Sequence, residues 1–317
     1  MMYPIDFFFR AAQRYPDRVA LLGPAEQRVS FSELAKRVRA LAAAMQAQDP
    51  CEQSRVAICA GNHAAHVVAL LATLAAGKVW VPLNVRSTAV EIDRIIKAVA
   101  PSILITDDKG QELTGASTTA NTEGNSTVMA RWSMQAADLP SIDSVSALHH
   151  DKPLGCITTG RDATQAIKFT GGTTGAPKGV MQPYRAWNAC IINQIHGWNL
   201  TPDDRYVVCA PVTHGTSTYI VPVLAQGGCL VFPEQNNPAG IASAFSEYKG
   251  TISFMPPTLI YMLMSDPAVK AEDFASLRHL VFGGAPMPPE KVDRAISFFG
   301  PRMAATYGQT ESPQIVV

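Results

Sequence analysis

Residues 169–180 read Phe169-Thr170-Gly171-Gly172-Thr173-Thr174-Gly175-Ala176-Pro177-Lys178-Gly179-Val180. This stretch offers backbone N–H groups, hydroxyl donors and one positive charge to a single anion, and polyphosphate is the ligand that uses all three. It differs from the common phosphate-loop pattern, which needs Gly-Lys followed by Ser or Thr. Because Pro177 biases Ala176 towards an extended conformation, we predict that the loop leads out of a strand and not straight into a helix. The alternative is a flexible glycine linker, but linkers rarely combine threonines with a Pro-Lys-Gly ending.

The chain on both sides of this loop alternates between strand-like and helix-like segments. The short apolar run Arg55–Cys59 predicts a buried strand, and the nearly all-apolar Ala64–Ala76 predicts a buried helix. Alternation of this kind indicates parallel βαβ units, so we expect an α/β fold with mainly parallel sheets between helices. Further strands are predicted at 19–22, 79–81, 102–106, 166–169, 205–210, 229–232, 251–255, 279–282 and 303–306, and further helices at 90–99, 184–195, 219–225, 239–247, 257–265 and 288–298.

One part of the chain breaks this pattern. Residues 110–150 show no clear periodicity, and Thr114–Thr127 contains almost only small and polar residues. We predict a surface loop there.

The composition excludes several classes of partner. The chain has 317 residues, enough for one large or two ordinary domains, and its 47% apolar and 16% charged content fits a well-packed globule. Lys plus Arg balance Asp plus Glu at 26 each, so neither nucleic acid nor an anionic membrane surface is favoured.

Targeting signals and metal-ligand patterns are also weak in this sequence. The longest nearly apolar run, Val67–Ala76, is too short for a membrane span, and we expect a cytoplasmic protein without a transmembrane segment. The six cysteines include no Cys-x-x-Cys, which predicts reduced, mostly buried thiols. His63 and His66 lack a second pair of ligands nearby and are interpreted as structural. A homodimer is a further expectation.

Three segments after predicted strands carry candidate binding residues. Gly283-Gly284-Ala285-Pro286 would let a flat ligand approach the backbone closely, although an ordinary turn has the same composition. In Thr306–Glu311, Tyr307 offers a stacking face, Thr310 a hydroxyl and Glu311 a hard oxygen for Mg²⁺. His214, followed by Gly215, lies just after the strand predicted at 205–210, where a lone histidine is either a ligand-binding residue or, more often, a structural one.

The stretch 169–180 resembles the phosphate loop of the adenylate-forming enzymes, which comprise the acyl-CoA and aryl-CoA synthetases, the luciferases and the adenylation domains of peptide synthetases. The family pattern is an aromatic residue followed by Thr-Ser-Gly-Ser/Thr-Thr-Gly-x-Pro-Lys-Gly, and the chain matches it except that Gly171 replaces the serine. Tyr15–Ala20 and Val79–Asn84 are similar to amino-terminal pieces of the family, so the resemblance covers nearly the whole chain and is weakest across 110–160.

The resemblance implies a fold and a set of ligands. It implies that residues 1–317 form the large amino-terminal AMP-binding domain, with one subdomain at 51–195 and the other at 1–50 plus 196–317. The ligands implied are ATP, Mg²⁺, a small-molecule carboxylic acid and coenzyme A. The nucleotide-binding residues implied are Thr170, Gly171, Gly172, Thr173, Thr174, Gly175, Lys178, Gly283, Gly284, Ala285, Pro286, Thr306, Tyr307, Gly308 and Thr310, with Glu311 for the metal and His214 and Gly215 for the acid.

The implied activity is activation of the acid through an acyl-adenylate, followed by transfer to coenzyme A. The segment 211–215 and the run Tyr307–Pro313 are most similar to fatty-acid and aryl-acid CoA ligases. Gly215–Thr218 lacks the acid that peptide-synthetase domains use to hold an amino group. The alternatives are a non-catalytic nucleotide-binding fragment and a luciferase-like oxygenase.

Family members continue beyond the position of Val317. They add an aspartate that holds the ribose hydroxyls, a hinge, and a small carboxyl-terminal domain with the lysine that assists adenylation. We therefore expect this chain to be a fragment or a truncated protein, with the catalytic lysine beyond its end.

Overall fold

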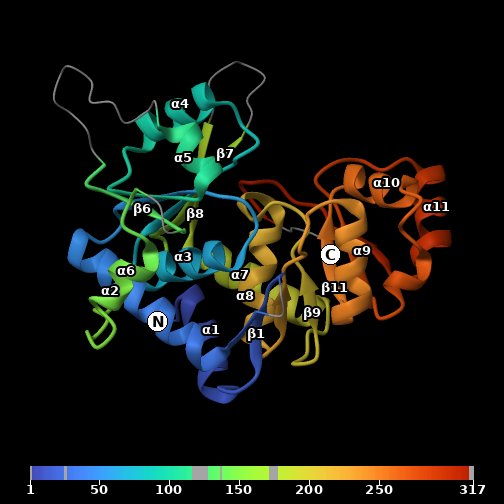
Figure 1. Cartoon of the computed structure of the whole chain (residues 1–317), viewed down its shortest axis with the longest axis horizontal. Helices are drawn as coiled ribbons and strands as arrows, with labels where there is room; N and C mark the ends of the chain where they lie inside the picture. Colours follow the sequence, from blue (N-terminus) through green and yellow to red (C-terminus); the bar gives the residue numbers. More distant parts are fainter. Residues whose placement is uncertain (1, 25–26, 116–127, 136–137, 171–177, 314–317) are drawn as a thin grey trace. The chain divides into compact units, whose positions relative to one another are not determined.

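The computed structural model describes residues 2–24, 27–115, 128–135, 138–170 and 178–313. The chain divides into two compact units, one formed by Met1–Ile5 and Glu33–Trp187 and the other by Asp6–Ser32 and Asn188–Val317. The units change after residues 5, 32 and 187, whereas the subdomains expected from the sequence change after residues 50 and 195. Each unit contains one mostly parallel sheet with helices (Figure 1).

The sheet of the first unit has the strand order β6-β5-β3-β4-β7-β8. All neighbours pair in parallel except β7 and β8, which form an antiparallel hairpin. The strands are β3 (Arg55–Cys59), β4 (Val79–Leu83), β5 (Ile103–Thr106), β6 (Ala130–Ser133), β7 (Thr164–Thr170) and β8 (Lys178–Pro183). The helices are α2 (Phe31–Gln48), α3 (Ala64–Ala75), α4 (Ala89–Val99), α5 (Asp108–Thr114) and α6 (Ile142–Ala147).

Helix formation in this unit follows from local sequence. Helix α3 is apolar nearly all round, and its residues from His66 to Ala75 are buried. Helix α4 begins with a capping box in which Thr88 accepts from the Glu91 N–H and the Glu91 side chain accepts from the Thr88 N–H. The apolar face of α4 then packs on β3, β4 and β5 in one core, formed by Ala57, Cys59, Val81, Leu83, Ile92, Ile95, Ile96, Val99 and Leu104.

The sheet of the second unit has the strand order β13-β12-β11-β9-β10-β1-β2. The first six strands of this order are parallel, and β2 is antiparallel to β1. The strands are β1 (Val19–Leu22), β2 (Arg28–Ser30), β9 (Arg205–Val207), β10 (Cys229–Val231), β11 (Ile252–Met255), β12 (His279–Phe282) and β13 (Met303–Ala305).

Helices of this unit pack on its sheet around a second core that includes Phe245, Met255, Phe274, Leu280 and Phe299. These helices are α9 (Pro238–Tyr248), α10 (Pro257–Ser265), η4 (Ala271–Phe274) and α11 (Pro289–Phe299). The unit also contains η3 (Val212–Thr216) and α8 (Ser217–Ala225). Three helices of the described chain contain a boundary between the units: α1 (Pro4–Arg14), α7 (Tyr184–Gly197) and α2, whose first two residues belong to the second unit. None of the helices within the described ranges is long and apolar enough to cross a membrane.

The structure confirms the α/β class and most predicted elements. The surface loop predicted at Thr114–Thr127 lies, from residue 116 on, outside the described residues. Regular elements do occur elsewhere in the region 110–150, which showed no clear periodicity in the sequence. That region contains β6 and α6, and β6 pairs in parallel with β5 from Ile103↔Ala130 to Thr106↔Ser133. A four-residue strand at a sheet edge carries too little periodicity to be recognised alone. The strand predicted at 205–210 is also shorter, because the chain leaves the sheet after Val207 and enters the π-helix η3. Strands β2 and β8 were not predicted.

Candidate ligand site at the strand ends

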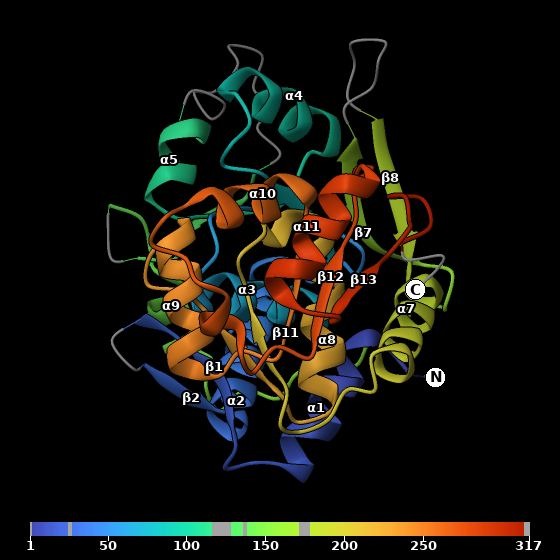
Figure 2. The ribbon, with the colours of Figure 1, turned by 90° about the vertical axis from the view of Figure 1, so that its right-hand side faces the viewer.

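Two of the predicted binding segments follow neighbouring strands of the second unit. Strands β12 and β13 are parallel, with Phe282 opposite Ala305, so both segments leave the carboxyl edge of one sheet (Figure 2). The Thr306 N–H donates to the Phe282 carbonyl at 2.8 Å, which extends the pairing into the two segments. Ligands of open α/β sheets bind outside this edge.

Steric constraints explain why the first segment, 283–286, contains two glycines. A Cβ atom on Gly283 would lie 2.5 Å from the Thr306 carbonyl oxygen and 2.8 Å from its Cγ2, so only glycine permits this approach. Gly284 has φ +81°, in the left-handed region that favours glycine, and a Cβ there would meet nothing within 4 Å. The turn is therefore packed against Thr306 on one side and open beside Gly284.

The second segment presents its polar groups to solvent. Tyr307 is 60% exposed, and its hydroxyl accepts a hydrogen bond from Gln309 Nε2 at 3.3 Å. The backbones of Gln309 and Ser312 exchange hydrogen bonds at 3.0 and 3.2 Å, which closes a tight turn around Thr310 and the exposed Glu311. The segment thus offers an aromatic face, a hydroxyl and a carboxylate along one short turn.

His214 lies beyond the end of β9, two strands away from β12 in the same sheet. Its φ and ψ of −118° and −134° depart from helical values inside η3. Its Nδ1 atom lies 2.8 Å from Thr213 Oγ1, which fixes the orientation of the ring. The next residue, Gly215, packs against the ring of Phe254, where a Cβ would come within 2.7 Å of Cε1.

The sequence analysis missed three stacked aromatic residues, of which Phe254 packs against Gly215. The rings of Tyr206 and Tyr219 stack with centroids 5.5 Å apart, and those of Tyr219 and Phe254 with centroids 5.7 Å apart. The Tyr206 hydroxyl accepts from the Phe254 N–H at 3.3 Å, and burial raises the pKa of Tyr206. The signal available in the sequence was Phe254, the aromatic residue before Met255-Pro256-Pro257. Only the folded sheet shows that this residue lies beside Gly215, next to His214 in the chain.

The central part of the predicted phosphate loop, Gly171–Pro177, lies outside the described residues. Its two ends, Thr170 and Lys178, are opposite each other where β7 and β8 pair. This agrees with the prediction that the loop leads out of a strand and not into a helix. Lys178 is exposed. In the same hairpin, buried Lys168 lies opposite Val180 and places Nζ 5.2 and 5.6 Å from the ring centroids of Trp80 and Trp187, an arrangement that the sequence analysis did not identify.

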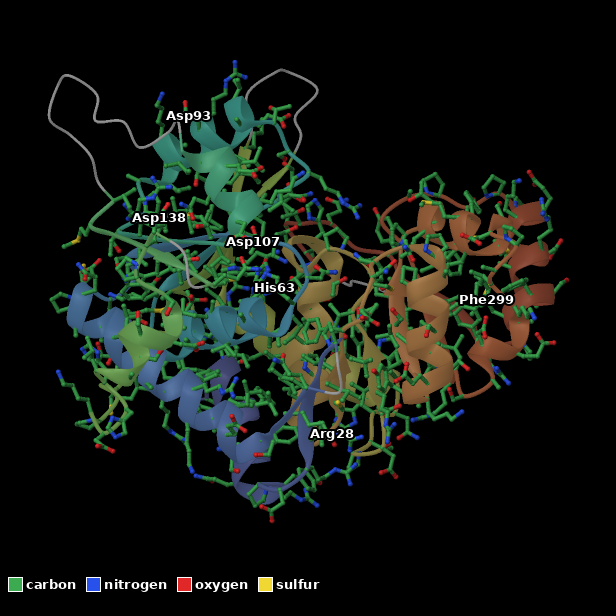
Figure 3. The ribbon with its side chains drawn as sticks, in the orientation of Figure 1. Arg28, His63, Asp93, Asp107, Asp138 and Phe299 are labelled. Atoms are coloured by element: carbon green, nitrogen blue, oxygen red, sulfur yellow. The ribbon has the colours of Figure 1, made fainter. Side chains whose placement is uncertain are left out.

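A second polar cluster lies at the carboxyl ends of β3 and β5 in the first unit. Asp107 accepts from the N–H groups of Gly61 at 2.8 Å and Gly110 at 2.7 Å, and His63 Nε2 lies 3.5 Å from its Oδ2 (Figure 3). Burial raises the pKa of Asp107, but the hydrogen bonds from His63 and these two amides outweigh it, so the net pKa is lowered. Within the described residues, no group of three His, Cys, Asp or Glu side chains is placed to hold a metal ion.

Comparison with known proteins identifies the relatives of this fold. The sequence profile described as "AMP-binding enzyme" matches residues 8–317. The chain belongs to the AMP-binding enzyme family. Among curated relatives, feruloyl-CoA synthase of Amycolatopsis sp is 30% identical over 294 residues, which are 91% of this chain and 56% of that protein. Indoleacetate–CoA ligase of Aromatoleum aromaticum is 26% identical and is matched over 97% of this chain and 60% of its own length.

Solved structures agree with this family. The amide bond synthetase McbA from Marinactinospora thermotolerans has a TM-score of 0.86 at 25% identity, covering 99% of this chain and 61% of that one. ATP-bound MatB from Rhodopseudomonas palustris, at 24% identity and a TM-score of 0.84, shares the fold over 99% of this chain and 61% of its own. The AMP-binding chain described here spans about half the length of the curated relatives it matches.

Proposed function

We propose that this chain forms the ATP-binding and acid-binding part of an AMP-forming carboxylic acid–CoA ligase. The observation that carries the proposal is the position of the Gly283–Pro286 turn and the Thr306–Glu311 segment on adjacent parallel strands of one sheet. Membership of the AMP-binding family and the names of its relatives support it. In this reaction the carboxylate attacks the α-phosphate of ATP, pyrophosphate leaves, and the thiol of coenzyme A then displaces AMP.

The roles proposed for the nucleotide-binding residues follow from their chemistry. The open glycine at 284 and the exposed ring of Tyr307 suit the flat faces of a purine. Thr310 would donate to the α-phosphate, and the exposed Glu311 would hold Mg²⁺, which commonly binds one or two carboxylates and substrate phosphates. Thr170, Lys178 and the residues between them would bind the leaving pyrophosphate through backbone N–H groups and one positive charge.

The acid would bind beside His214 and Gly215. The partly exposed ring of Phe254, stacked on the buried rings of Tyr219 and Tyr206, gives this region one flat aromatic face, which favours a planar aromatic acid over a long alkyl chain. Several relatives are named for aromatic acids, such as feruloyl-CoA synthase, indoleacetate–CoA ligase and 4-coumarate–CoA ligase 5. An aryl acid is therefore our first choice of substrate, and a fatty acid the second.

The proposal is tested by measuring nucleotide binding first and acid activation second. Calorimetry should detect MgATP binding to the chain, and an aryl acid should promote exchange of labelled pyrophosphate into ATP more than fatty or amino acids of similar size do. MgATP binding with neither binding of any acid nor exchange would support the alternative of a non-catalytic nucleotide-binding protein. A chain that binds no MgATP would contradict both. Cytoplasmic location and a homodimer remain predictions from sequence.

A further inference from the structure

One hydroxyl group in the segment after β9 differs from its neighbours in the group that it contacts. Thr216 and Ser217 donate to backbone carbonyls of the segment, those of Ala210 at 3.0 Å and His214 at 2.7 Å. Thr213 instead places Oγ1 2.8 Å from Nδ1 of the His214 ring. The hydroxyls of Thr216 and Ser217 therefore fix the backbone of this segment, whereas the hydroxyl of Thr213 acts on a side chain.

The hydrogen bond between Thr213 and His214 can run in two directions, and burial decides between them. Either the hydroxyl donates to Nδ1, or Nδ1 carries a proton and donates to Oγ1. Thr213 is 7% exposed, and its Oγ1 has no second hydrogen-bond partner within the described parts of the chain. In the second direction the hydroxyl proton would lack an acceptor, which is unfavourable for a buried donor. The Thr213 hydroxyl thus donates to Nδ1.

The direction of this hydrogen bond fixes the tautomer of the His214 ring. A neutral imidazole has one protonated and one unprotonated nitrogen, so a ring that accepts at Nδ1 carries its proton on Nε2. The buried hydroxyl also holds the Nδ1 edge of the ring at the protein, although His214 as a whole is exposed. The Nε2–H group is therefore the donor that His214 can offer to a molecule arriving from solvent.

We infer that Thr213 is a positioning residue for the organic acid, because it holds His214 in the tautomer whose Nε2–H donates to the acid carboxylate. The inference rests on the proposed function, in which the acid binds beside His214 and Gly215. An ionised carboxylate only accepts hydrogen bonds, so the opposite tautomer, with a lone pair on Nε2, would repel it. The bond from Nε2 would hold one carboxylate oxygen and leave the other to attack the α-phosphate of ATP.

The tautomer is tested by NMR of the ligand-free chain labelled with ¹⁵N in its histidine rings. The His214 signals are assigned by their loss in His214→Ala. At about pH 8, where neutral histidine rings predominate, they should show an unprotonated Nδ1 and a protonated Nε2. Thr213→Ser keeps the hydroxyl and should keep this pattern, whereas Thr213→Val keeps the shape, removes the donor and should introduce the other tautomer. A protonated Nδ1 in the parent would overturn the inference and leave the proposed function intact.

Binding of the acid shows whether this tautomer matters for the proposed site. The probes for calorimetry are benzoate, cinnamate and indoleacetate, which are planar aryl acids of increasing size. Thr213→Val should weaken binding of the acid that the parent binds best by about two- to tenfold, the effect of one neutral hydrogen bond. Thr213→Ser should bind this acid like the parent, and the MgATP affinity should be unchanged in both variants. Parent-like acid affinity in Thr213→Val would overturn the inference.

A double-mutant cycle with His214→Ala shows whether Thr213 acts through the ring. In the His214→Ala background, Thr213→Val should cause no further loss of acid affinity, because the hydroxyl has no ring nitrogen to hold. Equal losses with and without the ring would overturn the inference and assign Thr213 to packing. A parent that binds MgATP but none of the three acids would contradict the acid site of the proposed function, and the acid-positioning role of Thr213 with it, even with the expected NMR pattern.

Discussion

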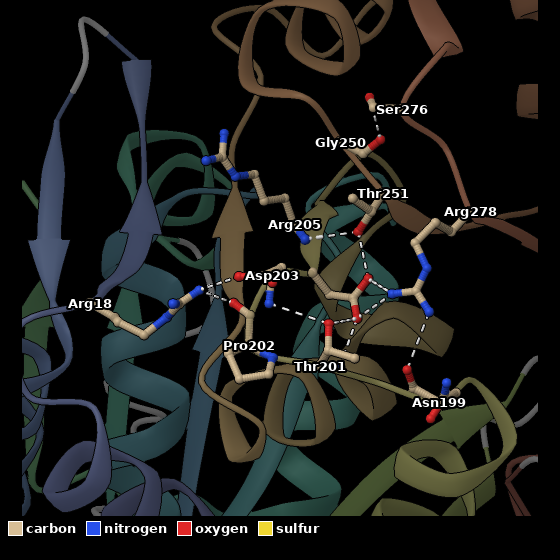
Figure 4. A network of polar contacts seen from close by, with 11 residues as sticks. Arg18, Asn199, Thr201, Pro202, Asp203, Arg205, Gly250, Thr251, Ser276 and Arg278 are labelled. Atoms are coloured by element: carbon tan, nitrogen blue, oxygen red, sulfur yellow. Dashed lines mark hydrogen bonds and ion pairs between the residues drawn. The ribbon is translucent and has the colours of Figure 1, made fainter.

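Arg278 and Asp204 form an ion pair in the second unit in which Nη1 of the arginine lies 2.7 and 2.9 Å from the two carboxylate oxygens. The carboxylate also accepts from Thr251 Oγ1 at 2.7 Å and from Thr201 N at 2.8 Å (Figure 4). Asp204 is 1% exposed. These contacts connect the amino ends of β9, β11 and β12, the edge of the sheet opposite the candidate site.

Asp204→Asn should therefore destabilise the second unit without touching the ligand residues. The amide keeps the size of the side chain but replaces an acceptor oxygen with a donor that faces other donors, which costs about 1–3 kcal/mol of unfolding free energy. Urea unfolding would measure it. The matched control is Asp203→Asn, because the Asp203 side chain is 90% exposed and forms a surface ion pair with Arg18; the urea midpoint of this variant should barely move. Equal midpoints for the two variants would contradict this account.

His66 should make the stability of the chain fall in mild acid. It is fully buried, its Nδ1 lies 2.8 Å from the Gly61 carbonyl, and burial lowers its pKa from 6.5 to about 4. Between these values the unfolded chain binds the proton that the folded chain excludes, so stability is full above about pH 6.5 and declines as the pH falls towards 4. The loss across that window is on the order of 3 kcal/mol.

Urea midpoints measured from pH 7 to pH 4 would test this slope. His66→Asn keeps a donor near the Gly61 carbonyl and removes the titrating ring, so its profile should be flatter than that of the parent. His150→Asn is the control, because the His150 side chain is 71% exposed. A slope that persists unchanged in His66→Asn would assign the acid sensitivity to other groups.

Gly283→Ala should impair nucleotide binding through sterics. The added methyl would come within 2.5 Å of the Thr306 carbonyl oxygen, which forces the turn and the Thr306–Glu311 segment apart. Overpacking of this kind costs about 1–3 kcal/mol of stability, and MgATP affinity measured by calorimetry should fall with it. Gly160→Ala is the control, because a Cβ there meets nothing within 4 Å. Parent-like MgATP affinity in Gly283→Ala would remove the turn from the proposed site.

Glu311→Gln should change the response to Mg²⁺ more than it changes folding. The side chain is exposed, so its loss costs little stability, but a neutral amide is a poorer ligand for a hard cation. Titration of Mg²⁺ at fixed ATP should show a weaker metal dependence of nucleotide binding. Glu290→Gln, an exposed carboxylate in the first turn of α11, should titrate like the parent. If both variants match the parent, Glu311 has no part in metal binding.

His214→Ala should weaken binding of the acid more than binding of ATP. His214 is oriented by Thr213, and the next residue, Gly215, packs against the ring of Phe254, two strands away from the Gly283 turn. Competition calorimetry with an aryl acid and with MgATP would measure both affinities on the same preparation. A parallel loss of both would show that His214 supports the fold of this edge and does not select the acid.

The sequence alone predicted most of the fold because the decisive patterns are local. The apolar run of α3 and the buried strand β3 were predicted almost to the residue, since burial on all sides leaves a continuous apolar stretch. The chemistry of Gly283–Pro286 and Thr306–Glu311 could also be predicted from the chain, because glycine, tyrosine and glutamate indicate what a strand end can bind.

Tertiary structure decided what no local pattern contains. Strand β6 exists because β5 offers it a parallel edge, and Gly283 is needed because the Thr306 carbonyl, far along the chain, lies against it. The stack of Tyr206, Tyr219 and Phe254 likewise comes from three separate elements of the fold. Such features depend on contacts between residues that are distant in the sequence. The geometry of these contacts is fixed only when the sheet sets strand order and register. Helix and strand periodicity, in contrast, depends on residues that are close together in the sequence.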